Sequence, residues 1–185
     1  MRPQDFLTPA EFDHLLASTG NARERAILHT LAGTGLRVHE LVALRVDNLD
    51  SDNGYIHVEV TKGSHPRTVI CPVVAFEAIR AYLTPGQAGY VFPGRQDGHL
   101  STKQVRRMLD EIAIRAGLQD LHDGQRRRIT PHLLRHSHAS WLLDRGISVA
   151  DVQAQLGHAS LATTGIYVAR MPSHRRESFK RAGLI

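Results

Sequence analysis

Six side chains that can act on a phosphate ester occur in four short strings of this 185-residue sequence. The strings are TGLRVHEL, VTKGSHPRTV, TPHLLRHSHASWLL and LGHASLATTGIYV, and the side chains are Arg37, Lys62, His132, Arg135, His158 and Tyr167. A guanidinium group can bind two phosphate oxygens at once, histidine and lysine can transfer protons, and a tyrosine hydroxyl can attack phosphorus. These residue types suit transfer of a phosphodiester to tyrosine, with protein cations in the place that metal ions take in many other phosphoryl-transfer sites.

The spacing around Arg37 places this residue beside a helix N-terminus. The GTG sequence at residues 33–35 breaks one predicted helix, and helical spacing resumes over residues 38–44. Backbone N–H groups at such a position attract anions. Glu40 follows three residues after Arg37, so its carboxylate can hold the guanidinium in one orientation on the same helical face.

His132 and Arg135 also share one helical face, because they lie three residues apart on a helix that Thr130 and Pro131 are predicted to begin. One helix face can then bind one phosphate. Taken alone, the pair would be interpreted as a surface histidine and a solvated arginine.

A competing interpretation of the same helix is a metal site. His132, His136 and His138 lie close together in a chain with 12 histidines, and the first two have i, i+4 spacing. However, no glutamate follows the first histidine as in zinc proteases, and the two leucines after it look like core contacts. Metal binding is therefore the weaker interpretation, and no metal or other cofactor is expected.

Taken together and in this order, the four strings resemble the active site of tyrosine recombinases. LGHASLATTGIYV is the most specific of them, because Gly157 can end a helix, His158 follows at once, and Tyr167 comes nine residues later. The resemblance implies that Arg37 and Arg135 bind the scissile phosphate. It also implies that His158 donates a hydrogen bond to a non-bridging oxygen.

The resemblance implies the covalent and proton-transfer roles as well. Tyr167 would attack phosphorus and form a 3′-phosphotyrosyl link, while His132 assists deprotonation of its hydroxyl. Lys62, near the tip of a predicted hairpin, would protonate the departing 5′ oxygen as general acid. Glu40 would support the site. The alternative for Tyr167 is a half-buried core tyrosine.

The function implied by this resemblance is DNA breakage and rejoining in site-specific recombination, independent of metal and ATP. One alternative is a type IB topoisomerase, which relaxes a single duplex by the same chemistry. Another is a non-catalytic DNA-binding regulator with the same fold.

The excess of basic over acidic residues in the chain is consistent with double-stranded DNA as the partner. The formal net charge is +5 and the isoelectric point is near 9.9, which favours an acidic partner, although basic runs can also be solvated surface. Four arginines are expected to contact the DNA backbone: Arg67, Arg126, Arg127 and Arg128.

Length and composition favour one globular unit. The chain is 42% hydrophobic and 22% charged, close to globular averages, and it is too short for two domains of ordinary size. Its single cysteine, Cys71, favours a reducing compartment and a packing role. No apolar run approaches the roughly 20 residues that span a bilayer, so we expect a cytoplasmic protein without a membrane partner.

Local signals predict a mainly α fold with a small antiparallel β-meander. Short β-rich runs are expected at residues 45–50, 55–60 and 67–71. Helices are expected at residues 9–17, from about 21 to 33, and at 38–44, 72–83, 101–116, 131–144, 148–155, 160–168 and 173–181.

The resemblance extends from Leu7 to about Arg181 and corresponds to a catalytic domain alone. Residues 1–185 are therefore expected to form one such domain, without the N-terminal core-binding domain that relatives use to clamp the other face of DNA. By the same resemblance the chain would form a homotetramer on DNA, in which the tail, residues 171–185, docks on a neighbouring subunit. Docking of the tail on its own subunit is the alternative.

Overall fold

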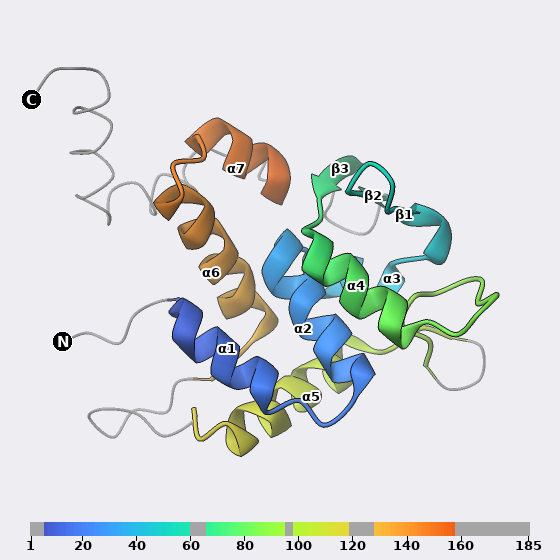
Figure 1. Cartoon of the computed structure of the whole chain (residues 1–185), viewed down its shortest axis with the longest axis horizontal. Helices are drawn as coiled ribbons and strands as arrows, with labels where there is room; N and C mark the ends of the chain where they lie inside the picture. Colours follow the sequence, from blue (N-terminus) through green and yellow to red (C-terminus); the bar gives the residue numbers. More distant parts are fainter. Residues whose placement is uncertain (1–5, 60–65, 95–97, 119–127, 158–185) are drawn as a thin grey trace, which may run out of the picture.

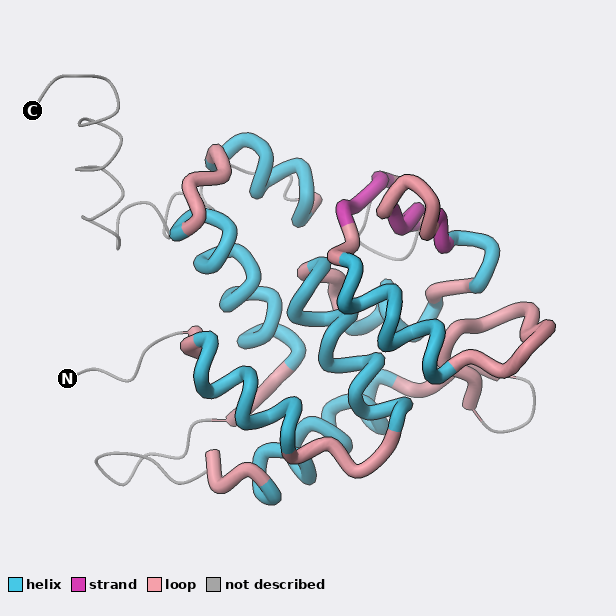
Figure 2. Tube along the Cα trace, in the orientation of Figure 1, coloured by secondary structure: helices cyan, strands magenta, loops and turns pink. Residues whose placement is uncertain are grey.

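The computed structural model of the chain describes residues 6–59, 66–94, 98–118 and 128–157. Over these ranges the chain is mainly helical with one small antiparallel sheet, which confirms the predicted fold class (Figures 1 and 2). The helices are α1 (Pro9–Ala17), α2 (Ala22–Thr34), α3 (Val38–Ala43), α4 (Val73–Tyr82), α5 (Thr102–Arg115), α6 (Pro131–Asp144) and α7 (Val149–Leu156). The sheet has the order β1 (Leu49–Asp50), β2 (Tyr55–Val58), β3 (Arg67–Ile70).

Side-chain caps fix where several helices begin. The Thr8 hydroxyl accepts a hydrogen bond from the Glu11 N–H, and the Glu11 carboxylate accepts one from the Thr8 N–H, which completes the predicted capping box of α1. The Asn21 side chain caps α2 in a similar way through the Glu24 N–H. Thr130 caps α6, the helix that carries His132 and Arg135.

Helix α2 lies at the centre of the described structure and packs against both α4 and α6 (Figure 1). Its apolar side chains are buried almost all round, as expected for a central helix. A smaller apolar cluster joins α6 to α7 and consists of Ala139, Leu143, Val152 and Leu156. The cluster holds α7 against α6, and a hydrogen bond from Gln155 Nε2 to Thr34 O joins the end of α7 to the end of α2.

Gly35 ends α2 beside side chains of both α6 and α7. Its φ of 66° lies in the left-handed region that favours glycine. A Cβ atom on Gly35 would lie 2.6 Å from Leu156 Cδ2 and 2.7 Å from His138 Cδ2. The predicted helix break at residues 33–35 is confirmed, and the glycine also lets three helices meet.

The three strands pair as an antiparallel meander, with Ile56 opposite Val69 and Val58 opposite Arg67. The prediction of a strand over residues 45–50 is wrong for its first part, where Val46–Asn48 form a 3₁₀ turn, η1. The Asn48 side chain accepts a hydrogen bond from the Arg45 N–H at 2.9 Å and closes this turn. The predicted helices 160–168 and 173–181 lie outside the described residues.

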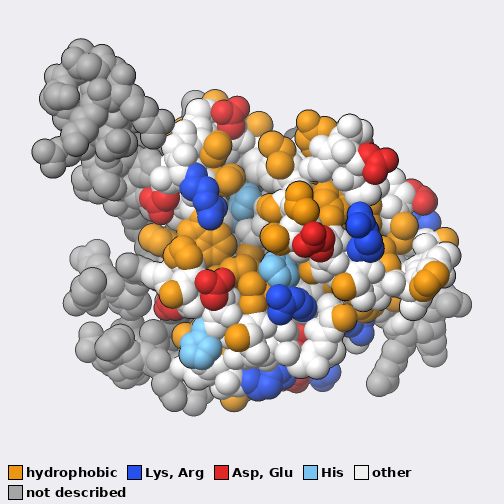
Figure 3. All heavy atoms as spheres, in the orientation of Figure 1, with side chains coloured by type: hydrophobic (Ala, Val, Ile, Leu, Met, Phe, Trp, Pro, Cys, Tyr) orange, Lys and Arg blue, Asp and Glu red, His pale blue; other side chains and the backbone are white. Residues whose placement is uncertain are grey.

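The face in Figure 3 carries basic and acidic side chains interspersed among apolar and neutral ones. The described side chains on this face therefore form no continuous basic surface. No helix within the described ranges is both long enough and apolar enough to cross a membrane. Cys71 is buried, as its predicted packing role requires, and burial raises the pKa of its thiol to about 12.

Candidate active site

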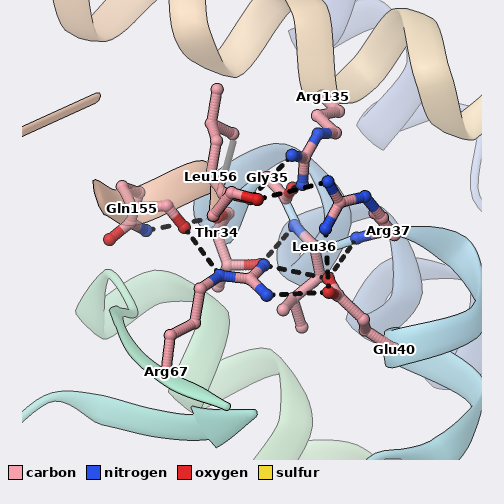
Figure 4. Close-up of polar contacts among 10 residues, drawn as sticks. Thr34, Gly35, Leu36, Arg37, Glu40, Arg67, Arg135, Gln155 and Leu156 are labelled. Atoms are coloured by element: carbon pink, nitrogen blue, oxygen red, sulfur yellow. Dashed lines mark hydrogen bonds and ion pairs between the residues drawn. The ribbon is translucent and has the colours of Figure 1, made fainter. Parts of the chain in front are cut away.

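Four segments of the chain meet at the C-terminal end of α7 (Figure 4). They are the loop between α2 and α3, the first half of α6, strand β3, and the last turn of α7 itself. The first three segments contribute one arginine each: Arg37, Arg135 and Arg67. The fold thus brings together Arg37 and Arg135, the two arginines that the sequence predicts as phosphate ligands.

Three consecutive carbonyl groups at this end of α7 accept hydrogen bonds from the three arginines. The pairs are Gln155 O with Arg67 Nε at 3.2 Å, Leu156 O with Arg135 Nη2 at 2.7 Å, and Gly157 O with Arg37 Nη2 at 3.3 Å. The last carbonyls of a helix have no partner within the helix and form the negative end of its dipole. The end of α7 is therefore suited to collecting cationic side chains.

Arg135 is almost fully buried, with 5% of its surface exposed. Its Nη1 donates to Gly35 O at 2.6 Å, while Nη2 donates to Leu156 O at 2.7 Å. The guanidinium thus spans from the end of α2 to the end of α7, and both contacts restrict its rotation. A planar guanidinium group held in this way has a fixed orientation.

Arg37 lies directly before α3, and Glu40 in the first turn of this helix contacts its guanidinium, as the spacing predicts. The Arg37 N–H donates to Glu40 Oε2 at 2.7 Å, and Arg37 Nη1 lies 3.3 Å from Glu40 Oε1. The Arg37 side chain remains 27% exposed, whereas that of Glu40 is fully enclosed. The predicted contact is confirmed, and the catalytic roles of both residues stay predictions.

Arg67 makes a contact that the sequence analysis missed. Its Nη1 and Nη2 donate to the two carboxylate oxygens of Glu40 at 2.7 Å and 2.9 Å (Figure 4). The alternation of side chains along a strand could have indicated this contact. Arg67 lies two residues before the buried Val69 and therefore faces inward. The DNA contact predicted for Arg67 remains untested, while the structure gives its guanidinium a different partner.

Glu40 stays ionised because two arginines surround it. Burial alone would raise the pKa of this carboxyl group. The hydrogen bonds from the Arg67 guanidinium and the Arg37 N–H, together with both positive charges, outweigh burial and hold the pKa below its usual range. The carboxylate therefore keeps its charge at neutral pH and can orient both guanidinium groups.

Gln155 is a second residue that the sequence analysis did not single out. Its side-chain Nε2 donates to Thr34 O at 3.1 Å and to Ile70 O at 2.8 Å, and its Oε1 accepts from the Ile70 N–H at 2.9 Å. The amide thereby joins α7 to the end of α2 and to β3. Its tertiary partners are distant in sequence, so no local pattern marks it.

Two other predicted site residues are described and exposed. His132 lies one turn before Arg135 on α6, consistent with the shared face that their spacing predicts. Arg128 Nη2 donates to Asp110 Oδ2 at 2.7 Å, and its side chain is 68% exposed, so its DNA contact stays a prediction. The other predicted site residues lie outside the described residues: Lys62, Arg126, Arg127, His158 and Tyr167.

His138, one of the three histidines weighed as metal ligands, lies in the core next to the site. Its ring Nδ1 hydrogen bonds to Ala32 O at 2.9 Å, and Nε2 is buried without a partner in the described part of the chain. Among the described residues no group of three or more His, Cys, Asp or Glu side chains could hold a metal ion. His138 is thus a buried core side chain in this structure.

Burial lowers the pKa of His138 to about 4; the bond to Ala32 O opposes the shift, and the charges of Arg135 and Arg145 add to it. Between this pKa and the ordinary 6.5, the unfolded chain binds a proton that the folded chain does not. The free energy of unfolding should therefore fall as the pH drops through this window, by about 3 kcal/mol in total. In His138→Phe this pH dependence should be lost.

Urea denaturation of both proteins at several pH values measures the effect. His29, whose pKa is also lowered by burial, is present in both proteins. The difference between the two proteins in how steeply the free energy of unfolding changes with pH therefore isolates His138. If the free energy of unfolding changes equally with pH in the wild type and the variant, the lowered pKa of His138 is wrong.

Residues 5–174 of the chain match the model of the phage integrase family. The chain is 37% identical over 168 residues to the tyrosine recombinase XerA of Pyrococcus furiosus, which covers 88% of this chain and 56% of that protein. It is 39% identical over 149 residues to the tyrosine recombinase XerC of Xanthomonas axonopodis pv. citri, covering 78% and 46% respectively. The chain thus spans about half the length of these relatives.

Solved structures agree with these sequence matches. A crystal structure of XerA recombinase superposes with a TM-score of 0.80 at 31% identity, covering 96% of this chain and 64% of that one. The XerH site-specific recombinase bound to its difH substrate gives a TM-score of 0.75 at 26% identity, covering 94% and 52%. Since the family model spans nearly the whole chain, this chain belongs to the phage integrase family and has the fold of a tyrosine recombinase catalytic domain.

Proposed function

We propose that this chain breaks and rejoins DNA in site-specific recombination, through a 3′-phosphotyrosyl intermediate. The observation that carries the proposal is the convergence of Arg37 and Arg135 on Gly157 O and Leu156 O, directly before His158 in the chain. Two fixed guanidinium groups beside the predicted nucleophile string suit a phosphodiester anion. The matched relatives are named tyrosine recombinases, and XerH is a site-specific recombinase bound to its substrate.

In the proposed reaction, Arg37 and Arg135 bind the non-bridging oxygens of the scissile phosphate. Tyr167 loses its hydroxyl proton with the help of His132, and its oxygen forms a bond to phosphorus while the bond to the 5′ oxygen breaks. Lys62 gives a proton to the departing oxygen, and His158 donates a hydrogen bond to the phosphate. The new phosphotyrosyl ester conserves the energy of the broken bond, so rejoining needs no ATP.

Glu40 supports this reaction by keeping Arg37 oriented. Because Arg37, Arg135, Lys62 and His158 take the place of metal charge, the reaction should need no metal ion. We further propose that residues 1–185 act as one catalytic domain in the cytoplasm, as a homotetramer on double-stranded DNA. The tail, residues 171–185, would dock on a neighbouring subunit in that assembly.

The test is incubation of the full chain with supercoiled plasmid in EDTA, followed by quenching in detergent to trap covalent protein–DNA complexes. We expect a covalent adduct whose linked peptide contains Tyr167, together with recombinant products on plasmids that carry paired sites. An adduct with relaxation only would indicate a topoisomerase. DNA binding without any adduct would indicate a regulator, and a strict requirement for added Mg²⁺ would indicate different chemistry.

A further inference from the structure

We propose that Arg67 is a positioning residue of the active site, which fixes Glu40 and the C-terminal turn of α7 and so orients Arg37, and that it does not contact DNA. This inference rests on the proposed function for its effect on the reaction. Its structural part concerns contacts that exist without DNA.

The first observation is the way in which two arginines share one carboxylate. Arg67 makes two parallel contacts with Glu40, at 2.7 Å and 2.9 Å, whereas the guanidinium of Arg37 makes one longer contact at 3.3 Å. Two parallel N–H···O bonds are the stronger and more directional arrangement. Glu40 is therefore held mainly by Arg67, and it restrains Arg37 without fully occupying it.

This division leaves Arg37 available for a phosphate. The Arg37 side chain is 27% exposed, against 10% for Arg67. Without Arg67, Arg37 would be the only counter-ion of the enclosed Glu40 carboxylate among the described residues, and a closer pair would form. Such a pair would rotate the guanidinium of Arg37 and compete with the phosphate for its N–H groups.

The second observation is independent of Glu40 and concerns Gly157. The side chain of Arg67 passes so close to this residue that a Cβ on Gly157 would lie 2.8 Å from both Cδ and Nε of Arg67. Arg67 Nε also donates to Gln155 O at 3.2 Å. Gly157 O in turn accepts from Arg37. Arg67 thus packs on the turn that binds Arg37 and that precedes His158 in sequence.

The third observation is the inward direction of the side chain. Arg67 pairs with Val58 across the sheet, so the two side chains lie on the same face, and Val58 is buried. A phosphate contact needs an accessible cationic head, but the guanidinium of Arg67 is occupied by Glu40 and Gln155 O. This geometry favours an internal role over a contact with the DNA backbone.

The test compares Arg67→Met and Arg67→Lys with the control Arg107→Met in the full chain. Arg107 also pairs with a glutamate, Glu111, but its side chain is 75% exposed. For each protein we would measure the single-turnover cleavage rate at saturating DNA, the DNA affinity at several salt concentrations, and the carboxyl titration of Glu40 by NMR. Thermal unfolding would set a temperature at which all proteins are folded.

We expect both Arg67 variants to cleave about 10- to 100-fold more slowly, because small displacements of a catalytic group have effects of this size. Lysine should not restore the rate, because it cannot make the two parallel contacts with Glu40. DNA affinity and its salt dependence should stay unchanged. The midpoint of the Glu40 carboxyl titration should move to higher pH in Arg67→Met. Arg107→Met should cleave at the wild-type rate.

Wild-type rates in both Arg67 variants would overturn the proposal. A second outcome would also overturn it: lysine restores the cleavage rate almost completely, and in Arg67→Met the slope of log DNA affinity against log salt concentration is smaller by about one. A change of that size is expected when a single phosphate contact is lost. If the wild type forms no adduct, the proposed function fails, and the NMR and binding measurements decide the structural part. An unchanged Glu40 midpoint in Arg67→Met would then overturn it, whereas a raised midpoint with an unchanged salt slope would support it.

Discussion

Tyr167→Phe is expected to abolish the covalent protein–DNA adduct while leaving the fold and DNA affinity nearly unchanged. The substitution removes only the hydroxyl oxygen, which is the proposed nucleophile, and keeps the aromatic ring. No other residue in the proposed mechanism forms a bond to phosphorus. Detergent quenching of reactions with supercoiled plasmid, followed by electrophoresis of the protein-linked DNA, measures the result directly.

The matched control is Tyr55→Phe, which removes a hydroxyl from a 40% exposed tyrosine on β2. This variant should form the adduct at the wild-type rate. An adduct that persists in Tyr167→Phe would show that another residue is the nucleophile. Loss of DNA binding in that variant would show that the tyrosine has a role beyond chemistry.

The helices were predictable because their signals are local. Thr8, Asn21 and Thr130 accept hydrogen bonds within the next three residues, and Gly35 ends α2 through its own backbone conformation. The strand predicted at residues 45–50 shows the limit of this reasoning. Val46 N donates to Gly89 O at 2.8 Å, and this tertiary contact accompanies a 3₁₀ turn that β propensity alone does not indicate.

The contacts of the candidate site likewise include some that local spacing predicts and others that it does not. The contact between Arg37 and Glu40 follows from a spacing of three residues on one helix, and the sequence predicts it correctly. The contact between Arg67 and Glu40 joins residues 27 apart, and that between Arg37 and Gly157 joins residues 120 apart. These depend on how β3 and α7 pack, which no local pattern specifies. The predicted roles of Lys62, His158 and Tyr167 rest on the family resemblance alone.

Arg135→Lys is expected to slow cleavage by about 10²-fold or more, by analogy with the loss of one preorganised charge donor. The guanidinium of Arg135 reaches Gly35 O and Leu156 O at once, at 2.6 Å and 2.7 Å. A lysine ammonium is a single point of charge, so it cannot span both carbonyls and present a flat pair of donors to a phosphate. Single-turnover cleavage at saturating DNA measures the effect apart from binding.

Because Arg135 is buried, its replacement also removes contacts that hold α2 to α7, and a loss of stability could slow the reaction indirectly. Arg37→Lys separates these effects, since Arg37 is more exposed and makes no hydrogen bond to α2 in the described part of the chain. It should slow cleavage to a similar degree while its thermal unfolding stays closer to that of the wild type. If both variants cleave at nearly the wild-type rate under conditions where they are folded, the two arginines are structural, and the phosphate-binding role proposed for them is wrong.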